Sequence, residues 1–295
     1  MPDILITGGT GQVGSALGRL SWPEDIHIHT PPRAELDLCS AESISTFFQG
    51  KRFAAVINCA AYTAVDQAES DSAAAFLANS QGPAWMAEAT RNAKIPLIHL
   101  STDYVFDGSK TTAYSEDDET VPLGVYGASK RASELAVISG NPQSIVLRTA
   151  WVLSAHGSNF LKTMLRLARS NAEVRVVADQ VGCPTSATDI AIALQTMVLR
   201  MIEDSSAPHG IYHFVNAGKT SWCGLAQEIF TVSEEAGGPS AAVTAITSAE
   251  YPTAARRPAN SRLRTEKLQR DYRIRPREWQ SAVRDIVQEL LEPQK

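Results

Sequence analysis

Near its N-terminus the chain reads Asp3-Ile4-Leu5-Ile6-Thr7-Gly8-Gly9-Thr10-Gly11-Gln12-Val13-Gly14, a short apolar run that leads into a glycine-rich turn. From Gln12 to Leu20, apolar residues recur at helical spacing. Glycines at the spacing of Gly8, Gly11 and Gly14 permit a positive φ, a close approach of backbone amides to a pyrophosphate, and tight packing of helix on strand. The stretch therefore predicts a strand, a tight turn and a helix that together bind a dinucleotide.

Further apolar runs alternate with helical segments over the first half of the chain. The strands are expected at residues 26–29, 54–58, 96–101 and 144–148, separated by segments such as 72–92 that read as helices. Continuous apolar strands joined by crossover helices are typical of a parallel sheet with helices on both faces. We therefore expect an α/β, Rossmann-like doubly wound fold that binds its ligands at the carboxyl ends of the strands.

The regular alternation ends after about Trp151. Beyond it we expect strands at residues 174–177 and 211–215, an ordered loop at 252–258, and helices at 159–169, 188–201, 221–235 and 278–291. We assign residues 1–153 to an NADP(H)-binding Rossmann domain whose sheet is completed by later segments. Residues 154–295 are expected to form mainly a smaller, interleaved substrate-binding region.

Composition excludes several classes of protein. The 295 residues are 44% hydrophobic and 20% charged, which is ordinary for a soluble globular chain. A net charge of -5 without clusters of lysine and arginine argues against nucleic-acid and membrane partners, and the apolar runs are too short to span a bilayer. Four scattered cysteines without CxxC spacing, and the lack of a leader pattern, indicate a reduced, cytoplasmic protein.

A possible catalytic pair follows about 115 residues after the glycine turn, in Tyr126-Gly127-Ala128-Ser129-Lys130. Side chains four apart share one face of a helix, so the ammonium of Lys130 can lie beside the phenol of Tyr126. A neighbouring cation lowers the pKa of a phenol, which suits Tyr126 for proton transfer near neutrality. An amphipathic surface stripe is the alternative, but the glycine turn favours nucleotide-dependent redox chemistry.

The residues after the second strand bear on the choice of cofactor. An acidic residue there would bind the ribose 2'-hydroxyl of NAD, yet no carboxylate precedes Glu35. Arg33 is placed to meet the 2'-phosphate of NADP instead, although it is equally compatible with a solvent-facing loop. We expect NADPH, with NADH as the alternative.

Four further stretches narrow the class. These four stretches resemble signatures of the dTDP-4-dehydrorhamnose reductase family, within the extended short-chain dehydrogenases/reductases. They are Ser101-Thr102-Asp103-Tyr104-Val105-Phe106-Asp107-Gly108 and the sequences at 58–69 (NCAAYTAVDQAE), 148–152 (RTAWV) and 255–261 (ARRPANS). The resemblance runs from residue 3 to about 285. It implies reduction of the C4 carbonyl of dTDP-4-dehydro-6-deoxy-L-mannose to dTDP-L-rhamnose by NADPH or NADH.

The resemblance also implies roles for individual residues. Tyr126 would donate a proton to the C4 oxygen, Thr102 would hydrogen-bond the same oxygen, and Lys130 would lower the tyrosine pKa and bind the nicotinamide ribose. The cofactor would further be contacted by Gly8, Gly11, Gln12, Val13, Gly14, Arg33, Asp37, Leu38, Ala60, Ala61 and Thr63. Thr102, Asp103, Tyr104, Trp151 and Arg257 would contact the dTDP-sugar. Tyr104 and Trp151 are equally compatible with core packing, Asp37 with a helix start, and one of Arg256 and Arg257 with a structural role.

The chain departs from the family where some members bind magnesium between subunits. Ser15 and Thr188 occupy positions where those members have glutamates, so a hard cation would lack most of its oxygen ligands. Glu289 and Glu292 read as solvated helix charges. We therefore predict no metal site and no magnesium-bridged dimer, and leave a monomer and another kind of homodimer open.

Two other functions fit the same fold. One is a noncatalytic NADP-binding regulatory subunit, like the relatives that bind methionine adenosyltransferase. The other is a nucleotide-sugar epimerase or 4,6-dehydratase, which would retain NAD tightly. A dehydratase would use an Asp-Glu pair where this chain has Asp103-Tyr104.

Overall fold

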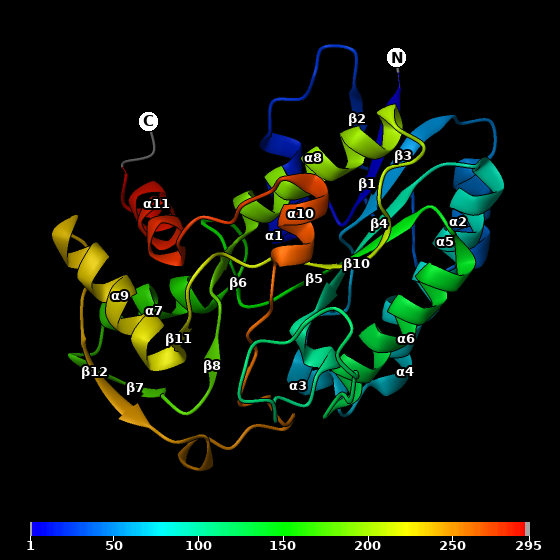
Figure 1. Ribbon diagram of the computed structural model, residues 1–295. Coiled ribbons are helices and arrows are strands. Elements are labelled where there is room, and N and C mark those ends of the chain that lie inside the picture. The colour runs from blue at the N-terminus through cyan, green and yellow to red at the C-terminus, as the bar shows by residue number, and fades with distance from the viewer. Residues whose placement is uncertain (1, 293–295) are drawn as a thin grey trace.

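The computed structural model describes residues 2–292 as a central parallel sheet with a smaller lobe beside it (Figure 1). The strand order is β10 (Gly210–His213), β5 (Ser144–Thr149), β4 (Leu97–Thr102), β3 (Phe53–Asn58), β1 (Asp3–Thr7) and β2 (His27–His29). All five pairings in this sheet are parallel. The predicted α/β doubly wound fold is confirmed.

Helices cover both faces of this sheet because the buried residues of each strand point alternately up and down. Ile4 and Ile6 pack with α1 (Gln12–Arg19) and α8 (Ala187–Glu203) in one apolar core. Leu5 packs on the other face with α2 (Ala41–Phe48), α5 (Gly82–Ala93) and α6 (Val125–Gly140). The continuous apolar pattern of strands such as β1 reflects burial on both sides.

The segment predicted as one helix over residues 72–92 is interrupted. It consists of α4 (Ser72–Phe76), a π-helical turn η1 (Leu77–Gln81) and α5. The π turn directs the buried Asn79 inward, where its amide bonds both the N–H and the C=O of Tyr62 and donates to Ser129 Oγ at 3.0 Å. A π turn of this kind often marks a functional site, and here it ties the loop before α3 (Val65–Ala68) to α6.

The smaller lobe has its own apolar core, at the lower left of Figure 1. It contains α7 (Phe160–Ala168), α9 (Trp222–Glu235), α11 (Trp279–Leu291) and the parallel pair β7 (Glu173–Val177) and β12 (Ala242–Ile246). There are also two short ladders, in which β6 (Val152–Leu153) pairs with β9 (Thr185–Ser186) and β8 (Val181–Gly182) pairs with β11 (Thr220–Ser221). The remaining elements are α10 (Glu266–Tyr272) and the 3-10 turns η2 (Asp103–Val105) and η3 (Ser248–Glu250).

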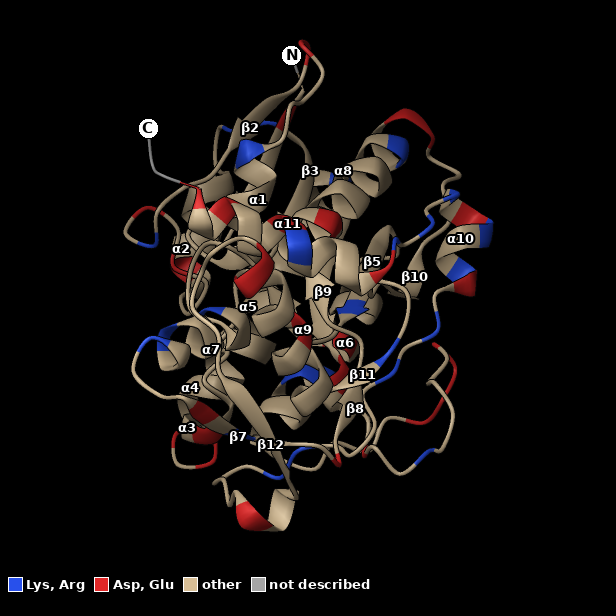
Figure 2. Cartoon of the chain, turned by 90° about the vertical axis from the view of Figure 1, so that its left-hand side faces the viewer, with Lys and Arg blue, Asp and Glu red and all other residues tan. Residues whose placement is uncertain are grey.

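Segments of the second half return to the main sheet. β10 pairs with β5, and α8 packs on α1. The division at residue 153 remains a prediction, since both lobes contain segments from the second half. Within residues 2–292 no helix is long and apolar enough to cross a membrane, and basic and acidic segments are interspersed along the chain (Figure 2).

Candidate active site

A cleft of about 1340 Å³ lies at the carboxyl ends of the sheet strands and extends to the smaller lobe. A second cavity, of about 860 Å³ between α2 and α5, contains none of the predicted site residues. The larger cleft is lined by nearly all of them, namely Gly8, Gly11, Gln12, Val13, Arg33, Asp37, Leu38, Ala60, Ala61, Thr63, Thr102, Asp103, Tyr104, Tyr126, Lys130, Trp151 and Arg257. Gly14 alone lies outside it.

The glycine turn fits a pyrophosphate. Gly8 has φ +70°, and a Cβ there would lie 2.7 Å from the backbone nitrogen of Ala60, so only glycine is accommodated. Gly11 is the N-cap of α1 and provides no capping side chain, which leaves the helix N-terminus facing the cleft. A Cβ on Gly14 would lie 2.2 Å from the carbonyl oxygen of Gly8, so Gly14 packs the helix on the turn.

Arg33 and Asp37 lie together at the β2 end of the cleft. Arg33 Nε lies 3.3 Å from Asp37 Oδ1, and the arginine side chain is exposed. Asp37 also accepts from the N–H of Cys39, whereas Ser40 caps α2 by accepting from Ser43. Asp37 therefore does not cap α2 itself, and its position in the cleft is consistent with the predicted adenine contact.

Two elements, β4 and α6, bring the predicted catalytic residues together. Thr102 ends β4, Tyr126 is the second residue of α6, and Lys130 follows one turn later. Thr102 lies close enough to Tyr126 for its hydroxyl to lower the pKa of the phenol, and both residues line the cleft. The helix begins where the N–H of Val125 donates to Glu69 Oε1 at 2.9 Å, a capping contact that the sequence did not reveal.

The expected effect of Lys130 on Tyr126 was wrong. Burial raises the pKa of Tyr126 to about 12, the hydrogen bond from Thr102 lowers it, and Asp103 raises it further, while Lys130 is not among the groups that shift it. The ammonium is directed elsewhere, because Nζ donates to the carbonyl oxygen of Leu100 at 2.7 Å. Tyr126 is consequently protonated at neutral pH, the state required of a proton donor.

Lys130 is itself strongly perturbed. Its side chain is buried at the floor of the cleft, and burial lowers its pKa to about 8, against the opposing effects of Glu134 and Cys59. Glu134 in turn holds Arg148 through a buried bidentate ion pair, with Nη2–Oε2 at 2.7 Å and Nε–Oε1 at 2.9 Å. The ammonium of Lys130, fixed at the floor of the cleft, can bind a ribose hydroxyl that faces the cleft.

Asp103 presents a buried carboxylate to the cleft. Its Oδ1 accepts from Thr102 Oγ1 at 3.1 Å, while Oδ2 has no partner among residues 2–292. Burial raises the pKa of Asp103 to about 6, against hydrogen bonds from Ser261 and Thr102. Asp103 thus lines the cleft with a carboxyl group that is itself buried, and it remains a predicted substrate contact.

The opposite wall is aromatic. Trp151, at φ +47°, stacks on Trp222 with ring centroids 3.6 Å apart and planes 10° from parallel. A Cβ on Gly182 would lie 2.4 Å from the Trp151 ring, so glycine lets the indole lie flat there. Trp222 and Phe160 line the cleft as well but were not predicted. No local sequence signal identifies them, because stacking across the lobe brings them together.

Arg257 is held by an acidic partner. Its guanidinium bonds both carboxylate oxygens of Asp66, with Nη2–Oδ2 at 2.8 Å and Nη1–Oδ1 at 3.1 Å. Arg256 is exposed and does not line the cleft. Of the two arginines, only Arg257 lines the cleft, and its contact with an anionic ligand remains a prediction.

Side chains at the positions considered for a metal are engaged otherwise. Ser15 Oγ accepts from Arg19 at 2.6 Å, and Glu289 lies 3.1 Å from His156 Nε2. Within the described range, 2–292, no three His, Cys, Asp or Glu residues gather into a site for a metal ion.

The fold and the cleft define a Rossmann-type nucleotide-dependent oxidoreductase, with a glycine turn at one end and a Thr-Tyr-Lys group at the strand ends. Residues 1–292 match the model of the protein family described as "RmlD substrate binding domain". The chain belongs to this family.

Relatives of known name support this assignment. The chain is 46% identical to a dTDP-4-dehydrorhamnose reductase of Sinorhizobium fredii, over 98% of this chain and 97% of that protein. It is similar to two crystal structures of reductases with the same name, each with a TM-score of 0.90. The Clostridium acetobutylicum structure is 34% identical and covers 98% of this chain and 99% of its own. The Bacillus anthracis structure, in complex with NADP, is 32% identical and covers 98% of this chain and 100% of its own.

Proposed function

We propose that the chain reduces the C4 carbonyl of dTDP-4-dehydro-6-deoxy-L-mannose with NADPH to form dTDP-L-rhamnose, the last step of dTDP-rhamnose biosynthesis. The observation that carries this proposal is the meeting of Thr102, Tyr126 and Lys130 at the end of β4, inside a cleft that begins at the glycine turn. Two of the relatives that carry the corresponding name are 46% and 37% identical over nearly the whole chain.

The residues divide the chemistry among them. NADPH supplies the hydride when bound. Tyr126, protonated at neutral pH because burial raises its pKa, donates its proton to the C4 oxygen. Thr102, which lines the cleft beside Tyr126, stabilises the charge developing on the same oxygen. Lys130 binds the nicotinamide ribose and thereby orients the hydride donor.

The walls of the cleft supply binding. The N-terminus of α1 and the Gly8 turn receive the pyrophosphate of the cofactor, and Arg33 receives the 2'-phosphate that distinguishes NADPH from NADH. The stacked indoles of Trp151 and Trp222 receive the apolar faces of the deoxysugar, and Arg257 receives the diphosphate. Asp103, which also lines the cleft, is the further contact proposed for the sugar.

The protein's setting belongs to the same proposal. The four cysteines, Cys39, Cys59, Cys183 and Cys223, are free thiols, which is consistent with a reduced, cytoplasmic compartment. We propose a monomer or a homodimer without a magnesium bridge, because Ser15 and Thr188 replace acidic ligands.

The activity is tested by following NADPH oxidation at 340 nm with the sugar nucleotide generated in situ and NADH in parallel. Consumption that depends on the sugar nucleotide, with dTDP-rhamnose as product, is the expected outcome. NADPH binding without consumption would instead favour a regulatory subunit. NAD retained through purification would favour an epimerase or dehydratase.

A further inference from the structure

A buried histidine lies directly beneath Lys130. His99 is in the middle of β4, fully buried, and does not line the cleft. Its Nε2 is 3.1 Å from Lys130 Nζ and 3.0 Å from Ser133 Oγ, and its Nδ1 is 3.0 Å from Asn58 Nδ2. The imidazole thus joins Lys130 at the floor of the cleft to Asn58 at the end of β3.

The surrounding hydrogen bonds fix the tautomer of His99. Asn58 Oδ1 accepts from the N–H of Ala60 at 3.1 Å and from Thr7 Oγ1 at 2.6 Å, so the amide nitrogen Nδ2 must face His99. Because Nδ2 is a donor, Nδ1 of the imidazole accepts, and the proton of the neutral ring is on Nε2. Burial and Lys130 both hold the pKa of His99 well below its ordinary value, so the ring is neutral.

With its proton on Nε2, His99 makes an unfavourable contact with the charged form of Lys130. Ser133 Oγ donates to the carbonyl oxygen of Lys130 and can therefore accept from Nε2–H. An ammonium has three donors and no acceptor, so Nζ and Nε2–H face each other donor to donor. The uncharged amine has a lone pair and relieves the conflict. Contact with His99 therefore disfavours the charged form of Lys130 while leaving its bond to Leu100 intact.

We propose that His99 is a positioning residue for Lys130, because its contact with Nζ favours the uncharged form of the amine that Leu100 holds at the floor of the cleft. The consequence rests on the proposed role of Lys130 toward the NADPH ribose, since a charged amine is the better donor. NADPH affinity should then fall as the pH rises through about 8, where Lys130 loses its proton. Other titratable or charged groups around this part of α6 are Glu134 and Tyr126 on the helix itself, Cys59 after β3, Asp103 and Tyr104 in η2, and Arg148 in β5.

Two variants test whether Nε2 of His99 acts as a hydrogen-bond donor or as an acceptor toward Lys130. His99→Asn retains a partner for Asn58 but leaves nothing at the place of Nε2. His99→Gln reaches that place with a freely oriented amide, which can donate to Ser133 and accept from Lys130. Both changes remove the N–H that faces Nζ of Lys130. The pH at which NADPH affinity falls should therefore rise by about one unit in His99→Asn, which corresponds to the free energy of roughly one hydrogen bond. It should rise at least as much in His99→Gln.

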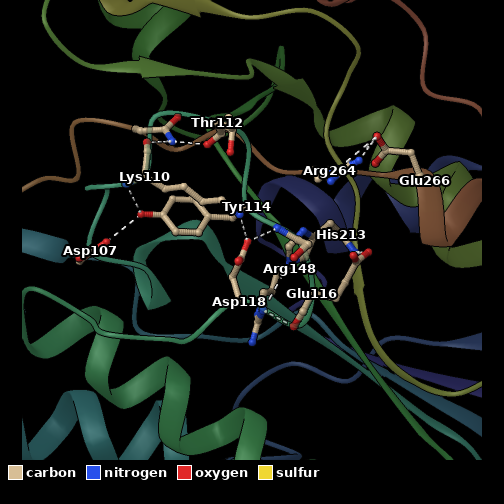
Figure 3. Close-up of polar contacts among 12 residues, drawn as sticks. Asp107, Lys110, Thr112, Tyr114, Glu116, Asp118, Arg148, His213, Arg264 and Glu266 are labelled. Atoms are coloured by element: carbon tan, nitrogen blue, oxygen red, sulfur yellow. Dashed lines mark hydrogen bonds and ion pairs between the residues drawn. The ribbon is translucent and has the colours of Figure 1, made fainter.

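His213 provides a matched control. It is also fully buried with a pKa held well below its ordinary value, and its Nε2 lies 3.4 Å from Arg148 Nη1 in a polar cluster outside the cleft (Figure 3). His213→Gln should lower the melting temperature, as we also expect of the His99 variants, without moving the pH dependence of NADPH affinity. Lys130→Met should abolish that dependence.

The measurement is the dissociation constant of NADPH between pH 6 and 10, from quenching of tryptophan fluorescence, with melting temperatures for each variant. An unchanged pH dependence in folded His99→Asn and His99→Gln would overturn the proposal. The proposal would also be overturned if the pH at which NADPH affinity falls became lower in His99→Asn and stayed the same in His99→Gln. That result would mean that Nε2 accepts a hydrogen bond from Lys130. The readout is binding alone, so it stands apart from any failure to turn over the sugar nucleotide.

Discussion

The two walls of the cleft are built in different ways. On the β4 and α6 side, Thr102 and Lys130 are buried and joined by hydrogen bonds to neighbouring groups. On the opposite side, Trp151 is held by stacking, and Arg257 by an ion pair whose Asp66 side chain is 46% exposed. The first wall is suited to fixed reaction geometry, and the second can adjust to a ligand. Substitutions on the first should therefore change kcat, and those on the second KM.

The largest effect is expected for Tyr126→Phe. Removing a proton donor should lower kcat by about 10²- to 10⁴-fold, while the dissociation constant of NADPH stays within about threefold. Steady-state kinetics and a fluorescence titration measure the two quantities. Unchanged turnover would remove Tyr126 from its proposed role.

Arg257→Ala should raise KM for the sugar nucleotide by roughly ten- to a hundredfold with little change in kcat, because the substitution removes a hydrogen bond to a charged group of the substrate. Asp66→Asn is the matched variant, because it breaks the same ion pair and leaves the guanidinium in place. Its KM should change much less. Equal increases in both variants would mean that Arg257 only supports the loop.

Arg33→Ala should reduce the preference for NADPH over NADH by about tenfold, since a partly exposed charge pair with a phosphate contributes on the order of 1–2 kcal/mol. The ratio of kcat/KM for the two cofactors measures this preference. A ratio equal to that of the unsubstituted protein would place Arg33 in solvent, its other sequence-based interpretation.

Asp103→Asn is expected to have the smallest effect, and one that depends on pH. Because the folded pKa is raised to about 6 from an ordinary 3.8, the folded state favours the protonated acid, and stability is lost as the pH rises from about 4 to 6. Asparagine keeps the acceptor for Thr102 but avoids the buried charge. The melting temperature of the variant relative to the parent should therefore be higher at pH 7 than at pH 4. A constant difference would contradict the raised pKa.

The predictability of the two walls also differs. Strands such as β1 have apolar runs, so sequence alone located them, and the proposed catalytic residues lie in short local motifs that sequence could single out. β12 was missed because four of its five residues are exposed or half-buried and show no buried pattern. Trp222 meets Trp151 only through packing across 71 positions, and Lys130 bonds a backbone carbonyl, which no side-chain pattern reveals.

The most direct test of this division is the single-turnover rate of NADPH oxidation at saturating sugar nucleotide, measured side by side for Tyr126→Phe and Arg257→Ala. The rate should fall by at least about a hundredfold in the first variant and return to within a few-fold of the parent in the second. A comparable loss in both variants, or a loss in Arg257→Ala alone, would contradict the assignment of the chemistry to the wall formed by β4 and α6.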